Sequence, residues 1–124
     1  MKLIEHFVNG KTFSGVSNRT GKVFNPATGE KSAEVKLASK KDIDHAVGTA
    51  KQAFSAWSIK PPLVRARVLF KFKNLIEKYS DDLTKIIVSE HGKVYEDAKG
   101  SLTRGLEVVE FACGIPQMLK GEFT

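Results

Sequence analysis

Cysteine is nearly absent from this sequence of 124 residues, which contains only Cys113. A single thiol excludes a disulfide within the chain, so we expect a reducing, cytoplasmic location. Long apolar runs are also missing, because no stretch approaches the roughly 20 residues that a membrane-spanning helix needs. The opening residues, MKLIEHFVNG, lack the apolar core and cleavage site of a signal peptide. These absences predict a protein with no membrane partner.

Motifs that mark common ligand sites are missing as well. The glycines follow neither the phosphate-loop nor the dinucleotide-binding spacing, and no Gly-x-Ser-x-Gly occurs. The histidines, His6, His45 and His91, are far apart, and no His-x-x-x-His or paired-cysteine spacing indicates zinc. Taken alone, these residues contain no complete catalytic constellation.

The charge is positive but scattered. The formal net charge is +6, with lysines and carboxylates mixed in segments such as KFKNLIEK. A nucleic-acid surface usually clusters its basic residues and places aromatic side chains among them for stacking. Phe70 and Phe72 instead fall in a periodic apolar segment that is typical of a core. The pattern favours solvated helix faces and no nucleic-acid partner.

The first third of the chain has the pattern of two β-hairpins. Asn9-Gly10 lies between two short β-prone runs in HFVNGKTF, where both turn positions require positive φ. In the second hairpin Pro26 starts a turn and Gly29 supplies a left-handed position. This predicts strands near Lys22–Asn25 and Ser32–Leu37.

The first two helices are predicted from a cap and a proline. Ser39 and Asp42 form a capping-box-like start, and Pro62 suits the first turn of the following helix after IKPP. Each helix carries apolar residues at helical spacing on one face. The two stripes are Ile43, Ala46, Val47, Ala50, Phe54 and Trp57, then Val68, Leu69, Phe72, Leu75, Ile76 and Tyr79.

Two further helices follow. Ser80 can cap one that Gly92 stops, and the last is predicted from about Tyr95 to Cys113, with Pro116 ending it. The inner face of the last helix is predicted to hold Ala98, Leu102, Leu106, Val109 and Cys113. Two hairpins and about four helices, with no clear inner domain boundary, fit either a small α+β domain or the opening of a larger fold.

Cys113 is predicted to be a structural thiol. A reactive thiolate needs a nearby cation or a helix N-terminus and partial exposure, whereas Cys113 falls at a helix C-terminal end among apolar neighbours. Proximity in space to His6, His45 or His91 remains open from the sequence. We expect a buried sulfur and no nucleophile.

Arg104 is the most informative charged residue because it interrupts an apolar helix beside Gly105. A glycine within a helix costs about 1 kcal/mol relative to alanine and often marks the close approach of another group. A guanidinium there can hold a carboxylate through two parallel hydrogen bonds. The alternative is an intrahelical pair with Glu107, which spacing alone favours.

Several stretches together resemble a known family. HFVNGK, VFNPATGE, DIDHAVGTAKQAFSAW, SEHGK and RGLEVVEFACGIP are similar to the N-terminal segment of the aldehyde dehydrogenase superfamily. EHGK with RGLEVVEFACGIP resembles the CoA-acylating, methylmalonate-semialdehyde branch. The resemblance covers the chain from about His6 to Thr124.

The resemblance implies an α/β fold of which residues 1–124 are the N-terminal portion of the NAD-binding domain: two short β-hairpins followed by about four helices. The nucleophilic cysteine, the glutamate base, the oxyanion-hole asparagine, the nucleotide-binding unit and the oligomerisation domain would all lie downstream. The complete relative would use NAD and CoA to convert malonate or methylmalonate semialdehyde, with loss of carbon dioxide, to acetyl- or propionyl-CoA. It would act in valine or inositol catabolism, as a homo-oligomer. The 124 residues alone are expected to be inactive.

Site roles follow from the resemblance too. This branch places an arginine that binds the substrate carboxylate at the position of Arg104, and that role then becomes preferred over the pair with Glu107. Some relatives bind a monovalent cation at positions matching Val23, Phe24 and Glu90. Glu90 replaces a shorter aspartate there, and an ordinary surface role for Glu90 is the stronger alternative.

Two other hypotheses stay open. The chain is either a segment of such an enzyme, a non-catalytic helical interaction module derived from the family, or part of a different aldehyde dehydrogenase branch. In the first case its apolar stripes should pack against polypeptide outside this chain, so that the isolated chain exposes apolar surface or self-associates.

Overall fold

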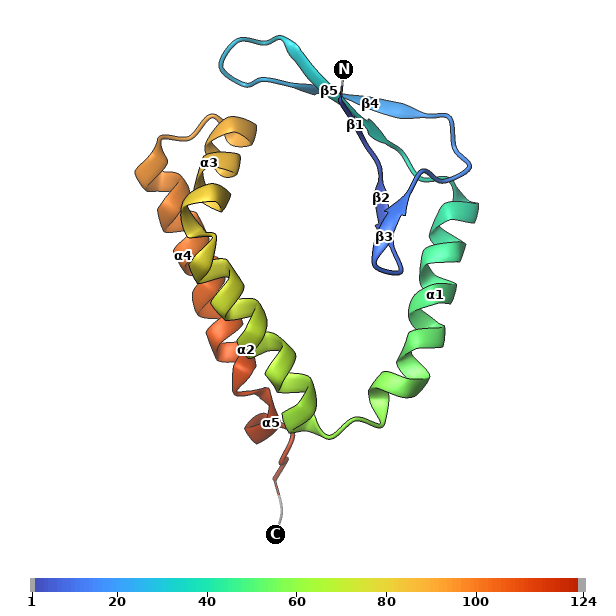
Figure 1. Ribbon diagram of the computed structural model, residues 1–124, viewed down its shortest axis with the longest axis vertical. Coiled ribbons are helices and arrows are strands. Elements are labelled where there is room, and N and C mark those ends of the chain that lie inside the picture. The colour runs from blue at the N-terminus through green and yellow to red at the C-terminus, as the bar shows by residue number, and fades with distance from the viewer. Residues whose placement is uncertain (1, 123–124) are drawn as a thin grey trace. The chain divides into compact units, whose positions relative to one another are not determined.

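The computed structural model describes residues 2–122 in two compact units, with the boundary between Ile59 and Lys60 (Figure 1). The sequence showed no inner boundary, but this one falls in the segment IKPP. The first unit holds five strands and the long helix α1 (Lys40–Ser58), and the second unit holds helices only. No helix among the described residues is long and apolar enough to cross a membrane.

The larger sheet of the first unit has three strands in the order β1-β5-β4. Strands β4 (Thr20–Phe24) and β5 (Lys31–Lys36) pair antiparallel, which confirms the second predicted hairpin. Strand β1 (Lys2–Ile4), which was not predicted, pairs parallel with β5 through Lys2 opposite Ala33. The sheet is therefore mixed, and its central strand is β5.

The first predicted hairpin is also confirmed. Strands β2 (His6–Val8) and β3 (Lys11–Phe13) pair antiparallel in a separate two-stranded sheet. Asn9 and Gly10 connect them with φ values of 55° and 73°. These left-handed values at both turn positions are the reason for the Asn-Gly pair.

Helix α1 begins with the predicted capping box. The Ser39 hydroxyl oxygen accepts the Asp42 backbone N–H, and the Asp42 carboxylate accepts the Ser39 backbone N–H at 2.8 Å. Asp42 also accepts the Val16 N–H at 2.7 Å, so one carboxylate joins the helix start to the preceding loop. These bonds, first from the Ser39 hydroxyl and then from the backbone N–H groups of Ser39 and Val16, lower the pKa of Asp42 to about 2. In that loop Gly15 has φ 70°, and a Cβ there would lie 2.8 Å from Asp42 Oδ1.

The second unit is a set of packed helices. It consists of α2 (Pro62–Lys78), α3 (Ser80–His91), α4 (Tyr95–Cys113) and the short α5 (Ile115–Met118). Helix α4 packs against α2, α3 and α5, and runs antiparallel to α2 (Figure 1). The predicted inner face of α4 is confirmed, because Ala98 and Cys113 are buried and Leu102, Leu106 and Val109 are partly covered.

Helix ends agree with the sequence at three places and differ at two. Pro62 occupies the first turn of α2, Gly92 ends α3 with φ 76°, and α4 has the predicted bounds. Ser80, however, is the first residue of α3 and does not cap it with its side chain. Pro116 follows α4 but also belongs to the first turn of α5, where a missing N–H costs nothing.

The total accessible surface is large for a protein of this size, and many large apolar side chains contribute to it. The accessible surface is 9689 Å², whereas two separate globular units of half this mass would together expose about 8,000 Å². The excess is similar in area to a standard protein–protein interface. Most of the two predicted apolar stripes contribute, including Val47 at 61% exposed and Phe54 at 64%. The stripes exist, but much of their surface is not covered by this chain.

Candidate functional site

Helix α4 carries the predicted substrate residue, and its neighbours fix it at both ends. Near its start, the Tyr95 hydroxyl donates to Asp81 of α3 at 2.8 Å, and this carboxylate raises the pKa of Tyr95. Near its end, Glu110 lies 3.2 Å from the Lys73 ammonium of α2. Lys73 also pairs with Glu77, and the two carboxylates raise the pKa of Lys73. The middle of α4 therefore belongs to a helix that is fixed by contacts near both of its ends.

Arg104 lies in this middle part with an exposed side chain. Its Nη2 donates to Ser101 Oγ at 3.2 Å, one turn earlier on the helix. The alternative pair with Glu107 is not formed, because no ion pair in residues 2–122 involves Arg104. A Cβ at Gly105 would meet no heavy atom within 4 Å, so this chain leaves the space around Gly105 open. The guanidinium is available to an anion.

A second cation shares the Ser101 hydroxyl. Lys93 lies in the turn before α4, and its Nζ donates to Ser101 Oγ at 2.9 Å. The same hydroxyl donates to the Asp97 backbone oxygen at 3.1 Å. Sequence patterns did not single out Lys93 or Ser101, although the spacing of three residues between Ser101 and Arg104 on a helix was a usable signal.

Cys113 is buried, as predicted, with 7% of its surface exposed. It is the last residue of α4, whereas His91 precedes the first residue of that helix. The helix between them is about 27 Å long at 1.5 Å per residue, which excludes contact between His91 and the thiol. His6 and His45 belong to the first unit, and both rings lie near that of Phe13. The burial of the sulfur agrees with a packing role.

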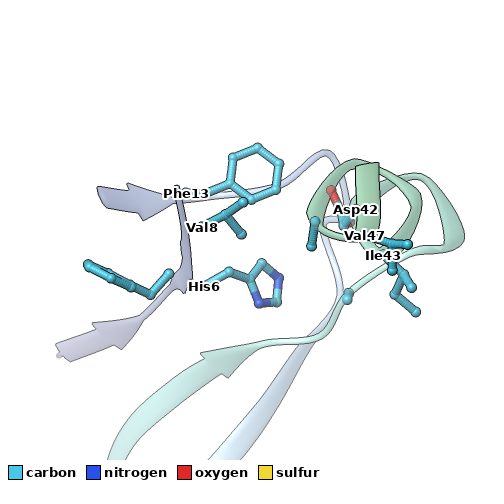
Figure 2. A pocket seen from close by; sticks show the side chains of 9 residues that line it. His6, Val8, Phe13, Asp42, Ile43 and Val47 are labelled. Carbon is cyan, nitrogen blue, oxygen red and sulfur yellow. The ribbon is translucent and has the colours of Figure 1, made fainter. Parts of the chain in front are cut away.

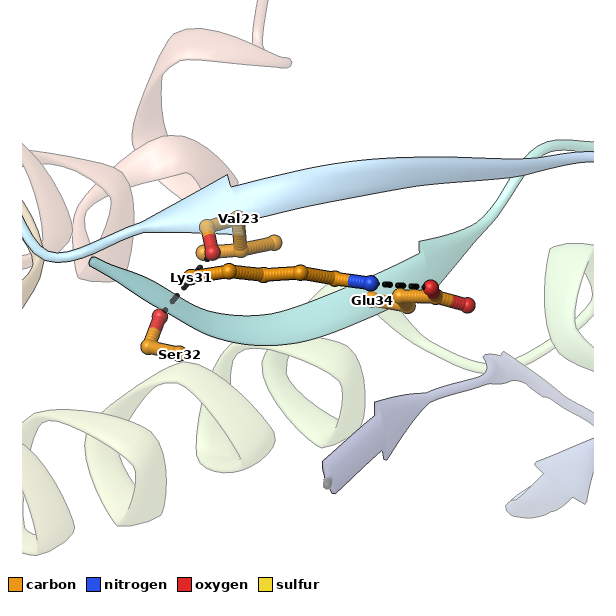
Figure 3. Close-up of polar contacts among 4 residues, drawn as sticks. All are labelled: Val23, Lys31, Ser32 and Glu34. Carbon is orange, nitrogen blue, oxygen red and sulfur yellow. Dashed lines mark hydrogen bonds and ion pairs between the residues drawn. The ribbon is translucent and has the colours of Figure 1, made fainter. Parts of the chain in front are cut away.

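The predicted monovalent-cation residues fall in different units. Val23 and Phe24 lie in β4, where the register shifts between them, and Glu90 is an exposed residue near the end of α3. The Val23 carbonyl accepts the Ser32 hydroxyl at 3.2 Å (Figure 3). Beside it Lys31 and Glu34 form an ion pair, which lowers the pKa of Glu34. A joint cation site of Val23, Phe24 and Glu90 stays a prediction.

A shallow apolar pocket of about 300 Å³ lies between the β2–β3 hairpin and α1. Phe13, Ile43 and Val47 line it, and the His6 ring lies among them (Figure 2). His6 Nε2 is buried without a hydrogen-bond partner. No cluster of three metal-binding side chains occurs in the part of the chain that the structure describes. The pocket is therefore mostly apolar, with the His6 ring and Asp42 as its polar side chains.

The first unit is a small mixed sheet, a hairpin and a capped helix, and the second is a set of packed helices that present an arginine. The same arrangement occurs in solved dehydrogenases, where it makes up about a quarter of the chain. The sequence model described as "Aldehyde dehydrogenase family" matches residues 13–124, so the chain belongs to the aldehyde dehydrogenase family.

Relatives and solved structures of one branch match all or nearly all of the chain. A malonate-semialdehyde dehydrogenase of Pseudomonas aeruginosa is 44% identical over 124 residues, covering 100% of this chain and 25% of the relative. The crystal structure of the methylmalonate-semialdehyde dehydrogenase of Oceanimonas doudoroffii matches with a TM-score of 0.94 at 48% identity, covering 98% of this chain and 25% of the other. A Sinorhizobium meliloti structure assigned to the same activity, in complex with NAD, matches with a TM-score of 0.95 at 46% identity, covering 100% of this chain and 25% of the other. The chain thus spans about a quarter of the length of these relatives.

Proposed function

We propose that this chain is the N-terminal part of an NAD-dependent, CoA-acylating malonate- or methylmalonate-semialdehyde dehydrogenase. The observation that carries the proposal is a difference in sequence identity between solved structures that share the same fold. Two methylmalonate-semialdehyde dehydrogenase structures are 46% and 48% identical to this chain, whereas a 3,6-anhydro-L-galactose dehydrogenase with a TM-score of 0.90 is 27% identical. Branch-specific identity on a shared fold supports the branch as well as the family.

The complete protein would oxidise the semialdehyde and release carbon dioxide, giving acetyl-CoA or propionyl-CoA. NAD would accept the hydride and CoA would accept the acyl group. The catalytic cysteine, the base and the nucleotide-binding unit would belong to the three quarters of the relatives that this chain does not match. Residues 1–124 would contribute the first part of the NAD-binding domain and the helix that faces the substrate. A cytoplasmic homo-oligomer is part of the same proposal.

Arg104 would bind the substrate carboxylate in that protein. Its guanidinium is exposed, has no carboxylate partner among residues 2–122, and lies on a helix fixed by contacts near both ends. A guanidinium holds a carboxylate through charge-assisted hydrogen bonds, which are roughly twice as strong as neutral ones. Removing one such contact costs about 1.5–3 kcal/mol, equivalent to about a tenfold to hundredfold loss in kcat/KM.

A chimaera tests this role directly. Residues 1–124 would replace the matching first quarter of the Pseudomonas aeruginosa enzyme, and kcat/KM would be measured with malonate semialdehyde and with propanal, which lacks the carboxylate. We expect Arg104→Ala to lower the value for malonate semialdehyde by about ten- to a hundredfold and to leave propanal nearly unchanged. Lys99→Ala removes another cation of the same helix, whose Nζ lies over the Tyr95 ring, and serves as the matched control. Equal kcat/KM values for malonate semialdehyde before and after Arg104→Ala would remove the carboxylate role. A folded chimaera without activity on malonate semialdehyde would remove the branch assignment.

The cation site belongs to the same proposal. Backbone oxygens of Val23 and Phe24 and the Glu90 carboxylate would bind a monovalent cation in the complete protein. Thermal unfolding of the chimaera in potassium and in tetramethylammonium chloride tests this, and Glu90→Gln should abolish any potassium-specific stabilisation. If potassium stabilises the chimaera and its Glu90→Gln variant equally, the cation site is wrong.

A further inference from the structure

Ser101 brings two cationic side chains together on one hydroxyl. Its Oγ accepts Lys93 Nζ at 2.9 Å and Arg104 Nη2 at 3.2 Å, and it donates its own proton to the Asp97 backbone oxygen. A hydroxyl has one donor and two acceptor positions, so all of its hydrogen-bonding capacity is used. The two cationic nitrogens are therefore no farther apart than the sum of those two distances.

Like charges held this close repel each other, and a nearby anion offsets this repulsion by attracting both. Some other lysines of the described chain have such an anion: Lys40 pairs with Asp44 at 2.6 Å, and Lys73 pairs with two glutamates. Neither Lys93 nor Arg104 forms an ion pair with a carboxylate of residues 2–122. The pair has a common hydrogen-bond acceptor but no counter-charge of its own.

We propose that Lys93 is a second cation for the substrate carboxylate and that Ser101 is the positioning residue that holds Lys93 and Arg104 side by side. The inference rests on the proposed function, because it adds two residues to the carboxylate site of Arg104. A carboxylate has two oxygens and about four lone-pair positions, so it can accept from a guanidinium and an ammonium at once. One such anion then offsets part of the positive charge that the two cations bring together. A neutral aldehyde gains nothing from either cation.

Kinetics of the same chimaera separate this site from Arg104 alone. We expect Lys93→Met, which keeps the aliphatic stem, to raise KM for malonate semialdehyde about tenfold, and Ser101→Ala to raise it about threefold. Lys93→Arg should restore most of the binding. KM for propanal should not change in any variant. Lys99→Met is the matched control for loss of one positive charge on the same helix.

The dependence of KM on ionic strength distinguishes a charge contact with the substrate from a purely structural role of Lys93. Because part of the site is exposed, added salt should raise KM for malonate semialdehyde, and Lys93→Met should weaken this dependence. If Arg104→Ala raises KM while Lys93→Met and Ser101→Ala both leave it unchanged, this inference is wrong and the proposed function stands. If Arg104→Ala itself leaves KM for malonate semialdehyde unchanged, the carboxylate-binding role of Arg104 is wrong.

A measurement on the 124-residue chain keeps the positioning role testable without turnover. The Nε–Hε signal of Arg104 can be followed by ¹H–¹⁵N NMR in the unsubstituted chain and in Ser101→Ala. We expect its order parameter to fall towards that of a freely moving arginine when the hydroxyl is lost. The same order parameter in both proteins would overturn the claim that Ser101 positions Arg104.

Discussion

Phe54 offers a measure of how much stability this chain draws from polypeptide outside it. The side chain lies on the apolar face of α1 and is 64% exposed. Replacing a fully buried phenylalanine with alanine costs about 3–5 kcal/mol of unfolding free energy. Only about a third of Phe54 is covered here, so Phe54→Ala should cost the 124-residue chain about 1–1.7 kcal/mol. The higher helix propensity of alanine reduces this cost further.

In the chimaera the remaining three quarters of the fold should cover α1, and the cost should reach the full range for a buried site. The expected difference between the two contexts is therefore about 2–3 kcal/mol. Urea unfolding of both proteins, with and without Phe54→Ala, measures it. Lys51→Ala, at an exposed position three residues earlier in α1, should stay within about 0.5 kcal/mol in both contexts. Equal costs of Phe54→Ala in the two proteins would show that this face is not an internal packing surface.

Three further results are expected. The isolated chain should self-associate with increasing concentration, because its excess apolar surface favours burial, and light scattering that shows a strict monomer would contradict this. Ser39→Ala should lower the unfolding free energy by about 1 kcal/mol through loss of the α1 cap, measured by urea unfolding with Ser58→Ala, at the other end of the helix, as the reference. The pKa of Asp42 falls from its ordinary value of 3.8 to about 2, so its contribution to stability is complete above pH 3.8 and is lost as the pH falls towards 2. Asp42→Asn should remove this part of the acid dependence of thermal unfolding, and an unchanged pH profile would refute the assignment.

Local signals predicted most of the fold. Asn9-Gly10, the Ser39–Asp42 capping box, Pro62 and Gly92 all act through the dihedral angles or hydrogen bonds of a few neighbouring residues, and each is found where it was predicted. Elements that depend on distant partners were not predicted. Strand β1 has only three residues, too few to show a period, and it exists because β5, about thirty residues later, pairs with it.

Two helix ends were misread because one residue type suits more than one role. Ser80 can cap a helix, but here its backbone oxygen accepts the Thr84 hydroxyl inside the first turn of α3. Pro116 can end a helix and can also begin one, and the short α5 uses the second property.

The candidate site was predicted only in part for a similar reason. Arg104 stood out because it interrupts an apolar helix, and the competing pair with Glu107 had the correct spacing. The structure instead joins Arg104 to Ser101 and brings Lys93 to the same oxygen from the turn before α4. No periodicity along one helix could predict a contact from a turn eight residues away.

Trp57 gives the chain an intrinsic optical probe. It is the sole tryptophan, it lies in the last turn of α1, and its side chain is 44% exposed. Indole fluorescence shifts to shorter wavelength when water is removed from the ring. Emission from this one ring should therefore follow, without any added dye, the moment at which another polypeptide covers the end of α1.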